Sequence, residues 1–108
     1  MMEEKRYRQL VAETYKKLEV AFDDVDPDVV ELTRAGDVVT LLFPDGMRCI
    51  LSPQPPLRQL WVAARTNAVH FNWNDEANAW HDDQGKGLEL WSYLKDLVKA
   101  EVGEDVAL

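Results

Sequence analysis

The two ends of the chain carry the hydrophobic spacing of amphipathic helices. Between Glu3 and Phe22, apolar side chains recur three or four positions apart, and charged side chains fill most of the positions between them. Asp26 precedes a proline and is therefore pushed away from helical geometry, so this helix should end shortly before it. The stretch from Leu88 to Glu101 repeats the helical spacing, and Gly103 follows as a terminator. The pattern predicts one helix at each end of the chain.

The middle of the chain has the shorter period of β-strands. Short apolar segments alternate with turn residues, and Asp45-Gly46 is a pair typical of hairpins. Since short turns join successive segments, the strands should pair antiparallel with their neighbours. The proline-rich stretch 53–56 should be the connection between the third and fourth strands. The six expected strands are Val29–Arg34, Val38–Phe43, Met47–Leu51, Gln59–Arg65, Val69–Trp73 and Ala79–His81.

The order helix, six strands, helix predicts an α+β fold. We expect a two-layer sandwich, in which an antiparallel sheet of about six strands packs both terminal helices on one face and leaves the other face open. A chain of 108 residues is the size of one domain, so residues 1–108 should form a single unit.

One strand indicates what the open face does. Alternation in the stretch 59–65 sends Leu60, Val62 and Ala64 to the core, and Gln59, Trp61, Ala63 and Arg65 to the open face. A large aromatic side chain beside an amide and a guanidinium is typical of a protein interface. The pattern is equally compatible with Trp61 half-covering an ordinary sheet surface.

The negative charge of the chain is local. Its net charge is −8, and six acids with no lysine or arginine lie between Glu19 and Glu31; the rest of the chain carries fourteen acids and twelve bases. This composition argues against nucleic-acid binding, which needs a basic face. The acidic stretch suits a cationic protein surface or metal ions, or it is a solvated edge that aids solubility.

Two of these acids conflict with local stability. Asp23 and Asp24 lie at the carbonyl end of the first predicted helix, where each negative charge is unfavourable by roughly 0.3–1 kcal/mol. Sites that break a local rule without evident compensation are candidates for function.

Motifs of catalysis are missing from the sequence. It contains no glycine-rich phosphate loop, no nucleophile elbow and no zinc spacing, so we do not expect an enzyme. His70 and His81 read as half-exposed strand residues, and Cys49 as a buried, reduced thiol. No apolar run approaches the length of a membrane span, and the N-terminus lacks a targeting pattern, so we expect a cytoplasmic protein without membrane contact.

Several segments of the chain resemble the frataxin family, in particular its bacterial CyaY-type members. They are FDDVDPD at the end of the first helix, VVTLLFPDGMRCILSPQPPLRQLWVAA, VHFNW, the lone Trp80, and WSYLKDL in the second helix. The most specific match is Gln54-Pro55-Pro56-Leu57 followed by the segment 59–63. The sequence departs from the family at Ser52, where asparagine is usual, and at Asn67-Ala68, which replaces a glycine-containing turn.

The resemblance implies a role in iron–sulfur cluster assembly. Such a protein binds iron weakly and exchangeably, acts as a regulator or iron supplier for the cysteine desulfurase and scaffold complex, and is a monomer that metal can drive into oligomers. The family's iron-binding and desulfurase-docking acids, here called the acidic ridge, correspond to Glu13, Glu19, Asp23, Asp24, Asp26, Asp28 and Glu31. Its scaffold-facing residues, here called the sheet surface, correspond to Gln54, Gln59, Trp61 and His70.

The sequence is also compatible with two other functions. An acidic helix on a small domain can dock on a basic partner, or inhibit a basic enzyme, without any physiological metal. Oxidation of Fe²⁺ on the ridge would instead make the protein a ferroxidase-like enzyme, although the sequence indicates no closed site to organise oxygen chemistry.

Overall fold

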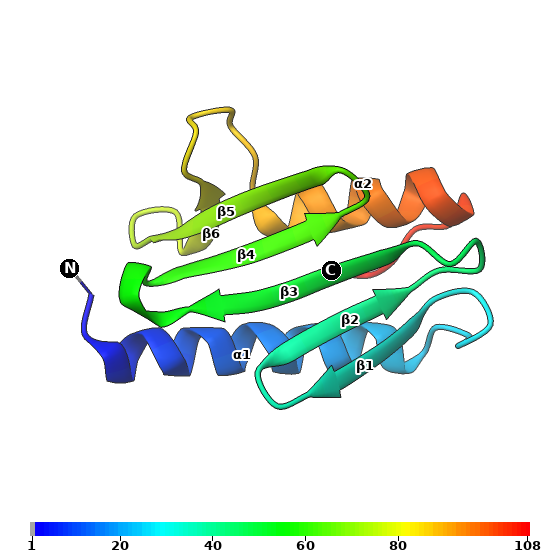
Figure 1. Ribbon diagram of the computed structural model, residues 1–108, viewed down its shortest axis with the longest axis horizontal. Helices are drawn as coiled ribbons and strands as arrows, with labels where there is room; N and C mark the ends of the chain where they lie inside the picture. The colour runs from blue at the N-terminus through cyan, green and yellow to red at the C-terminus, as the bar shows by residue number, and fades with distance from the viewer. Residues whose placement is uncertain (1) are drawn as a thin grey trace.

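The computed structural model describes residues 2–108, which form a six-stranded antiparallel sheet with a helix at each end of the chain (Figure 1). The strands lie in the sheet in their chain order, β1 to β6, so every connection is a hairpin. The elements are α1 (Glu4–Asp23), β1 (Glu31–Ala35), β2 (Val38–Leu42), β3 (Arg48–Gln54), the 3₁₀ turn η1 (Pro55–Leu57), β4 (Gln59–Ala64), β5 (Asn67–Asn74), β6 (Ala79–Asp82) and α2 (Leu90–Val102).

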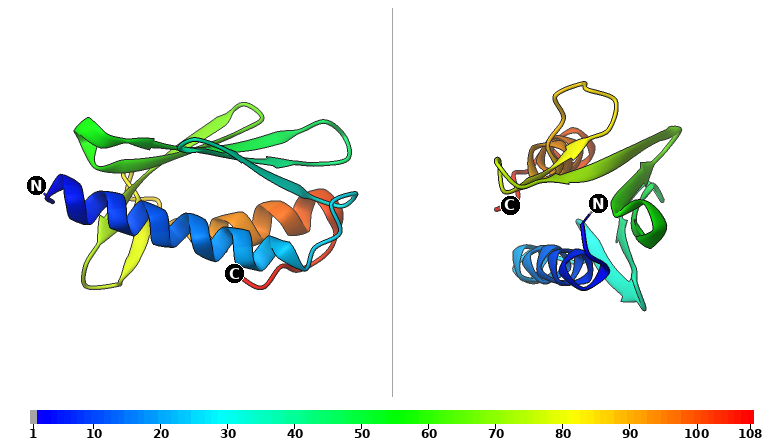
Figure 2. Two further views of the ribbon diagram at one scale, coloured as in Figure 1. Left: turned by 90° about the horizontal axis from the view of Figure 1, so that it is seen from below. Right: turned by 90° about the vertical axis from the view of Figure 1, so that its left-hand side faces the viewer.

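Both helices cover the same face of the sheet, and the opposite face is open (Figure 2). The core between the layers contains the inward side of each central strand, including Leu41, Leu51, Leu60 and Val62, all fully buried. The chain has the predicted α+β fold, and period-2 alternation correctly assigned the two faces of β4.

Two tyrosines on α1 connect the helix to the sheet through hydrogen bonds of their hydroxyl groups. Tyr7 and Tyr15 are both 1% exposed, and each hydroxyl reaches the backbone of the strands. The Tyr7 hydroxyl accepts a hydrogen bond from the Gln54 N–H at 2.9 Å and donates to the Gln59 carbonyl at 2.5 Å. The Tyr15 hydroxyl lies near the carbonyls of Asp37 and Leu51, at 2.7 and 3.2 Å. Burial raises the pKa of Tyr7, so the hydroxyl keeps its proton.

The first and third strands differ from their predicted limits. The predicted start at Val29 is wrong because the Asp26 carbonyl accepts the N–H groups of Val29 and Val30, which closes a turn before β1. Pro53 was expected in a connection but lies within β3, opposite Leu60. A proline is tolerated there because the pairing of β2 with β3 ends at Leu51, so the strand is an edge beyond that point.

The prediction that Arg65 belongs to the open face is wrong. Arg65 lies in the β4–β5 turn with φ 55°, which breaks the alternation of β4. Its guanidinium instead contacts Glu101 of α2 at 2.7 Å and Asp45 at 2.9 Å. Arg65 therefore joins a sheet turn to the second helix and is not available to the sheet surface.

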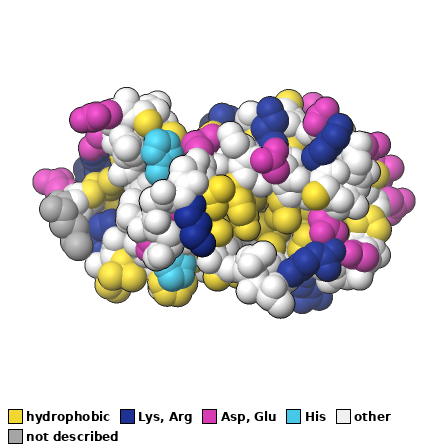
Figure 3. All heavy atoms as spheres, turned by 90° about the horizontal axis from the view of Figure 1, so that it is seen from above, with side chains coloured by type: hydrophobic (Ala, Val, Ile, Leu, Met, Phe, Trp, Pro, Cys, Tyr) yellow, Lys and Arg dark blue, Asp and Glu magenta, His cyan; other side chains and the backbone are white. Residues whose placement is uncertain are grey.

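The β6 side of the sheet is only partly covered. β6 pairs with the second half of β5, so the β5 residues before His70 have β4 on one side and no strand on the β6 side. Figure 3 looks at the molecule from the side on which β6 and α2 lie and shows hydrophobic side chains gathered near its centre, with charged side chains around them. Among residues 2–108, neither helix is long and apolar enough to cross a membrane.

Candidate interaction surface and acidic ridge

The register of the sheet brings the predicted contact residues into two neighbouring rows on the open face. In one row, Trp61 of β4 pairs with Ser52 of β3 and His70 of β5. In the next row, Gln59 pairs with Gln54 and Asn72. All four predicted residues of the sheet surface are half-buried, as expected for side chains that lie on a sheet without a covering layer.

Three of these residues contact one another through their side chains. The rings of Trp61 and His70 are stacked, with centroids 4.0 Å apart and planes 11° from parallel. The Trp61 indole Nε1 donates to Gln59 Oε1 at 2.9 Å. The amide nitrogen of Gln59 in turn lies 3.2 Å from Asn72 Oδ1. Trp61 is therefore held in one orientation by the stacked ring of His70 and by the side-chain amide of Gln59.

Gln54 is held in position by a hydrogen bond of its backbone N–H. No side-chain hydrogen bond of Gln54 occurs in the part of the chain that the structure describes, but its N–H donates to the buried Tyr7 hydroxyl. The same hydroxyl bonds the Gln59 carbonyl. Tyr7 thus fixes the end of the hairpin on which both glutamines lie.

Asp83 is a member of this surface that the sequence analysis missed. Its N–H donates to the His70 carbonyl at 2.8 Å and continues the β5–β6 ladder beyond β6. Asp83 Oδ2 lies 3.3 Å from the Gln59 amide nitrogen and 3.5 Å from His70 Nδ1. The alternation from Ala79 onward, extended into the loop, would have placed Asp83 on the open face with His81.

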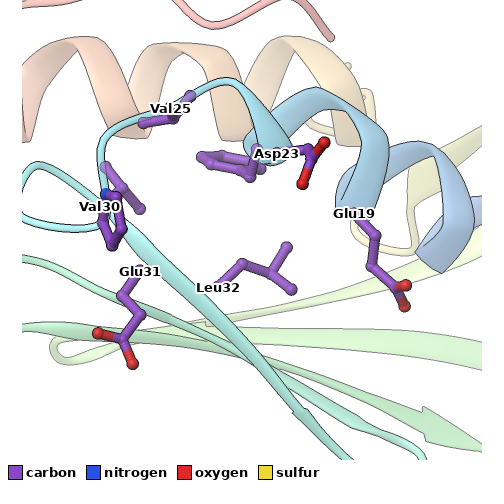
Figure 4. Close-up of a pocket in the computed structure, with 8 residues that line it drawn as sticks. Glu19, Asp23, Val25, Val30, Glu31 and Leu32 are labelled. Carbon is purple, nitrogen blue, oxygen red and sulfur yellow. The ribbon is translucent and has the colours of Figure 1, made fainter.

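The seven acids of the ridge are all exposed, but they do not converge. Glu19, Asp23 and Glu31 line a hollow of about 340 Å³ between α1 and β1, with Phe22, Val30 and Leu32 among its apolar walls. In Figure 4 the three labelled carboxylates point in different directions around this hollow. Within residues 2–108, no group of three or more His, Cys, Asp or Glu side chains is arranged to hold a metal ion.

Two acids of the ridge already have partners. Glu19 Oε1 accepts from Arg34 Nη1 of β1 at 2.9 Å, although both side chains are more than 40% exposed, so the pair contributes little to stability. Asp26 Oδ1 accepts the Asp28 N–H at 2.9 Å and closes the turn before β1. The contact between Arg34 and Glu19 could not be predicted from spacing along the sequence, because only the fold brings β1 beside α1.

Glu13 lies apart from the other ridge acids. It borders a separate hollow of about 200 Å³, together with Lys17, Trp80 and Trp91. That hollow lies on the α2 side of α1, whereas Glu19 and Asp23 face β1. The structure therefore divides the predicted ridge between two sides of the helix.

The remaining candidates match their predicted environments. Cys49 is fully buried, and burial raises the pKa of its thiol to about 12, so the thiolate that would bind metal or attack a substrate is not formed near neutral pH. His81 is half-exposed on β6, as predicted.

Comparison with known proteins identifies the family. The family model described as a Frataxin-like domain matches residues 1–104. The iron–sulfur cluster assembly protein CyaY of Pseudomonas aeruginosa is 41% identical over 105 residues, covering 97% of this chain and 95% of that protein. The protein of the same name from Tolumonas auensis is 39% identical and covers 99% of both chains.

Solved structures agree with this similarity. The frataxin of Psychromonas ingrahamii superposes with a TM-score of 0.88 at 28% identity, covering 97% of this chain and 96% of that one. A trimeric yeast frataxin, solved in complex with ferrous iron, has a TM-score of 0.64 at 21% identity, covers 96% of this chain and 89% of its own, and supports the fold alone. By sequence over nearly its whole length, and by fold, this chain belongs to the frataxin-like family.

Proposed function

We propose that this chain acts in iron–sulfur cluster assembly as an accessory protein rather than an enzyme. In this proposal the sheet surface docks on the scaffold, while the acidic ridge binds iron weakly and attracts the basic surface of the cysteine desulfurase. Membership of the frataxin-like family, with relatives named as iron–sulfur cluster assembly proteins, supports this role.

The observation that carries the docking part is the stacked pair of Trp61 and His70 on the open face. A large aromatic side chain that is half-buried and already held in one orientation is the typical anchor of a protein interface. Gln59 lies beside this pair and offers polar groups around the anchor.

The shape of the ridge supports weak and exchangeable iron binding. Tight oxygen-ligand sites for divalent cations gather several carboxylates at one point, whereas the ridge acids point apart around an open hollow. An ion bound by one or two of these carboxylates would keep most of its water. The same dispersed charge attracts a cationic protein surface from a distance and is screened beyond about 10 Å at 0.1 M salt.

A titration of the isotope-labelled protein with Fe²⁺ under anaerobic conditions tests the metal part. We expect NMR line broadening confined to residues 13–31 and persisting in excess Mg²⁺, with the strongest effect near Glu19, Asp23 and Glu31. Broadening that Mg²⁺ abolishes would contradict a role in binding iron.

Charge reversal tests the docking part with a matched control. The double variant Asp23→Lys/Asp24→Lys should weaken binding to the desulfurase, and raised salt should weaken binding of the wild type in the same way. Glu104→Lys/Asp105→Lys makes the same change in net charge at another pair of adjacent acids and should have a smaller effect. Equal effects of the two double variants would show that the ridge has no special role.

A second function is favoured by the scattered carboxylates. Because no three acids converge among the described residues, the ridge is also suited to docking on a basic partner without physiological metal. This alternative predicts salt-sensitive partner binding that is the same with and without Fe²⁺.

A further inference from the structure

The strongest unassigned feature is a closed ring of side-chain contacts on the open face. Trp61 donates to Gln59 through Nε1, Gln59 donates to Asp83 through Nε2, Asp83 faces His70 Nδ1, and His70 stacks on Trp61. Three of these four residues, Gln59, Trp61 and His70, are docking residues predicted from the sequence. Asp83 closes the ring from the loop that follows β6.

The chemistry of the ring makes Asp83 the member that orders the others. An ionised carboxylate only accepts hydrogen bonds, and an indole N–H only donates. Gln59 lies between the two and offers one donor end and one acceptor end, so its amide satisfies both neighbours in one orientation only. The nitrogen must face Asp83, at 3.3 Å, and the oxygen must face Trp61, at 2.9 Å. Asn72 Oδ1 also accepts from this nitrogen, at 3.2 Å, but an asparagine amide has a donor end as well as an acceptor end, whereas the carboxylate can only accept.

The same carboxylate acts on the imidazole. His70 Nδ1 lies 3.5 Å from Asp83 Oδ2, so the carboxylate favours a proton on Nδ1 over one on Nε2. With Nδ1 protonated, the Nε2 atom of a neutral His70 is an acceptor. The contact at Nδ1 and the stack on Trp61 together restrict rotation of the imidazole.

Asp83 is itself held firmly. Its side chain is only 20% exposed, and its N–H donates to the His70 carbonyl. The preceding Asp82 accepts the N–H groups of Gln84, Lys86 and Leu88 at 2.9 to 3.1 Å, which fixes the loop on which Asp83 lies. A carboxylate that is anchored in this way can fix the side chains that it contacts.

We propose that Asp83 is a positioning residue for the docking surface: it sets the Gln59 amide and the Nδ1–H form of His70, and so holds Trp61 ready to bind. The functional half of this inference rests on the proposed docking role. The structural half concerns the free protein and stands by itself.

The first experiment is NMR on the free protein and its variants Asp83→Ala and Asp83→Asn. Long-range proton–nitrogen spectra report the tautomer of His70, and the indole N–H resonance reports the acceptor at Trp61. Asp83→Ala should raise the Nε2–H population of His70 and shift the indole resonance. Asp83→Asn keeps an oxygen acceptor for the Gln59 amide and should restore the indole resonance. Asp105→Ala removes a charge at an 80% exposed side chain and should leave both signals unchanged.

The second experiment measures affinity for the desulfurase and scaffold complex with the same variants. Asp83→Ala should weaken binding roughly tenfold, as expected for loosening an interface anchor without deleting it. Asp83→Asn should return to within about threefold of the wild type, and Asp105→Ala should match the wild type.

The two readouts separate the possible failures. Unchanged His70 and Trp61 signals in Asp83→Ala would overturn the positioning role, whatever the affinity. Altered signals with unaltered affinity would overturn its importance for docking. A wild-type protein that does not bind the complex would refute the proposed docking function, while the NMR result would still decide whether Asp83 orders its neighbours.

Discussion

On the sheet surface Gln59, Trp61 and His70 contact one another, whereas on the acidic ridge the carboxylates point apart. The first region has one defined arrangement that a partner can fit. The second has charge without a fixed arrangement, apart from Glu19 and Asp26, which have partners of their own. Geometry should therefore dominate binding at the sheet surface, and net charge and salt should dominate binding at the ridge.

The largest effect that this comparison predicts is the loss of the sheet-surface anchor. Trp61→Ala should weaken binding to the assembly complex by about 2 kcal/mol or more, roughly 30-fold, because it removes the ring that His70 and Gln59 hold in place. The free energy of unfolding of this variant should change little, since Trp61 lies outside the core. Calorimetric titration measures the affinity. Ile50→Ala, which trims a 38% exposed side chain on the same face, is the control and should bind nearly as the wild type does.

The next effect links α1 to the sheet surface. Tyr7→Phe keeps the ring but removes the hydroxyl that joins Gln54 to Gln59, and should lower the free energy of unfolding by about 1–2 kcal/mol. It should also speed amide exchange at Gln54 and weaken docking. Tyr15→Phe is a matched control, because its hydroxyl bonds backbone at Asp37 and Leu51, away from that hairpin end.

The two tyrosine variants should separate stability from function. Denaturant unfolding should show similar losses for both, and only Tyr7→Phe should weaken partner binding. Equal losses of affinity would mean that docking follows overall stability and not the local arrangement of the sheet surface.

At the ridge, stability and binding should change in opposite directions. α1 ends at Asp23 with no basic residue in its last turn. Asp23→Lys should therefore stabilise the protein by roughly 0.3–1 kcal/mol through the helix dipole while it weakens docking on a basic partner. Thermal unfolding and binding assays of the same sample check the two signs. A destabilised variant would mean that the Asp23 carboxylate has a structural role, and the functional explanation of its position would fail.

The pattern of the sequence was sufficient for the architecture and for the half of the site that lies in regular strands. Period-2 alternation placed Trp61 on the open face, and helical spacing placed both terminal helices. The prediction from the sequence pattern failed at Arg65, where a positive φ ends the alternation. It also failed at Pro53, which lies in a strand because the edge position makes a proline tolerable there.

The missing members of both surfaces come from contacts between distant segments. Arg34 reaches Glu19 because β1 lies beside α1, and Asp83 reaches His70 because the ladder continues past β6. The division of the ridge, with Glu13 on the α2 side, depends on the direction in which each side chain leaves the helix. Helical spacing already indicates that Glu13 and Glu19 leave α1 in different directions, but it does not say which neighbouring element each one faces.

The smallest effect concerns the loop that carries Asp83. Hydrogen bonds from the N–H groups of Lys86, Leu88 and Gln84 lower the pKa of Asp82. Because the folded-state pKa lies below the unfolded value of about 3.9, the stabilisation is fully present above that value and is lost as the pH falls through the folded pKa. Protection of the Gln84, Lys86 and Leu88 amides from hydrogen exchange, relative to the intrinsic rate at each pH, should therefore fall only in that acidic range. If the Trp61 indole resonance shifts over the same pH range, the order of the sheet surface depends on this loop. If the loop opens and the resonance does not shift, the stacked pair of Trp61 and His70 is ordered independently of the loop.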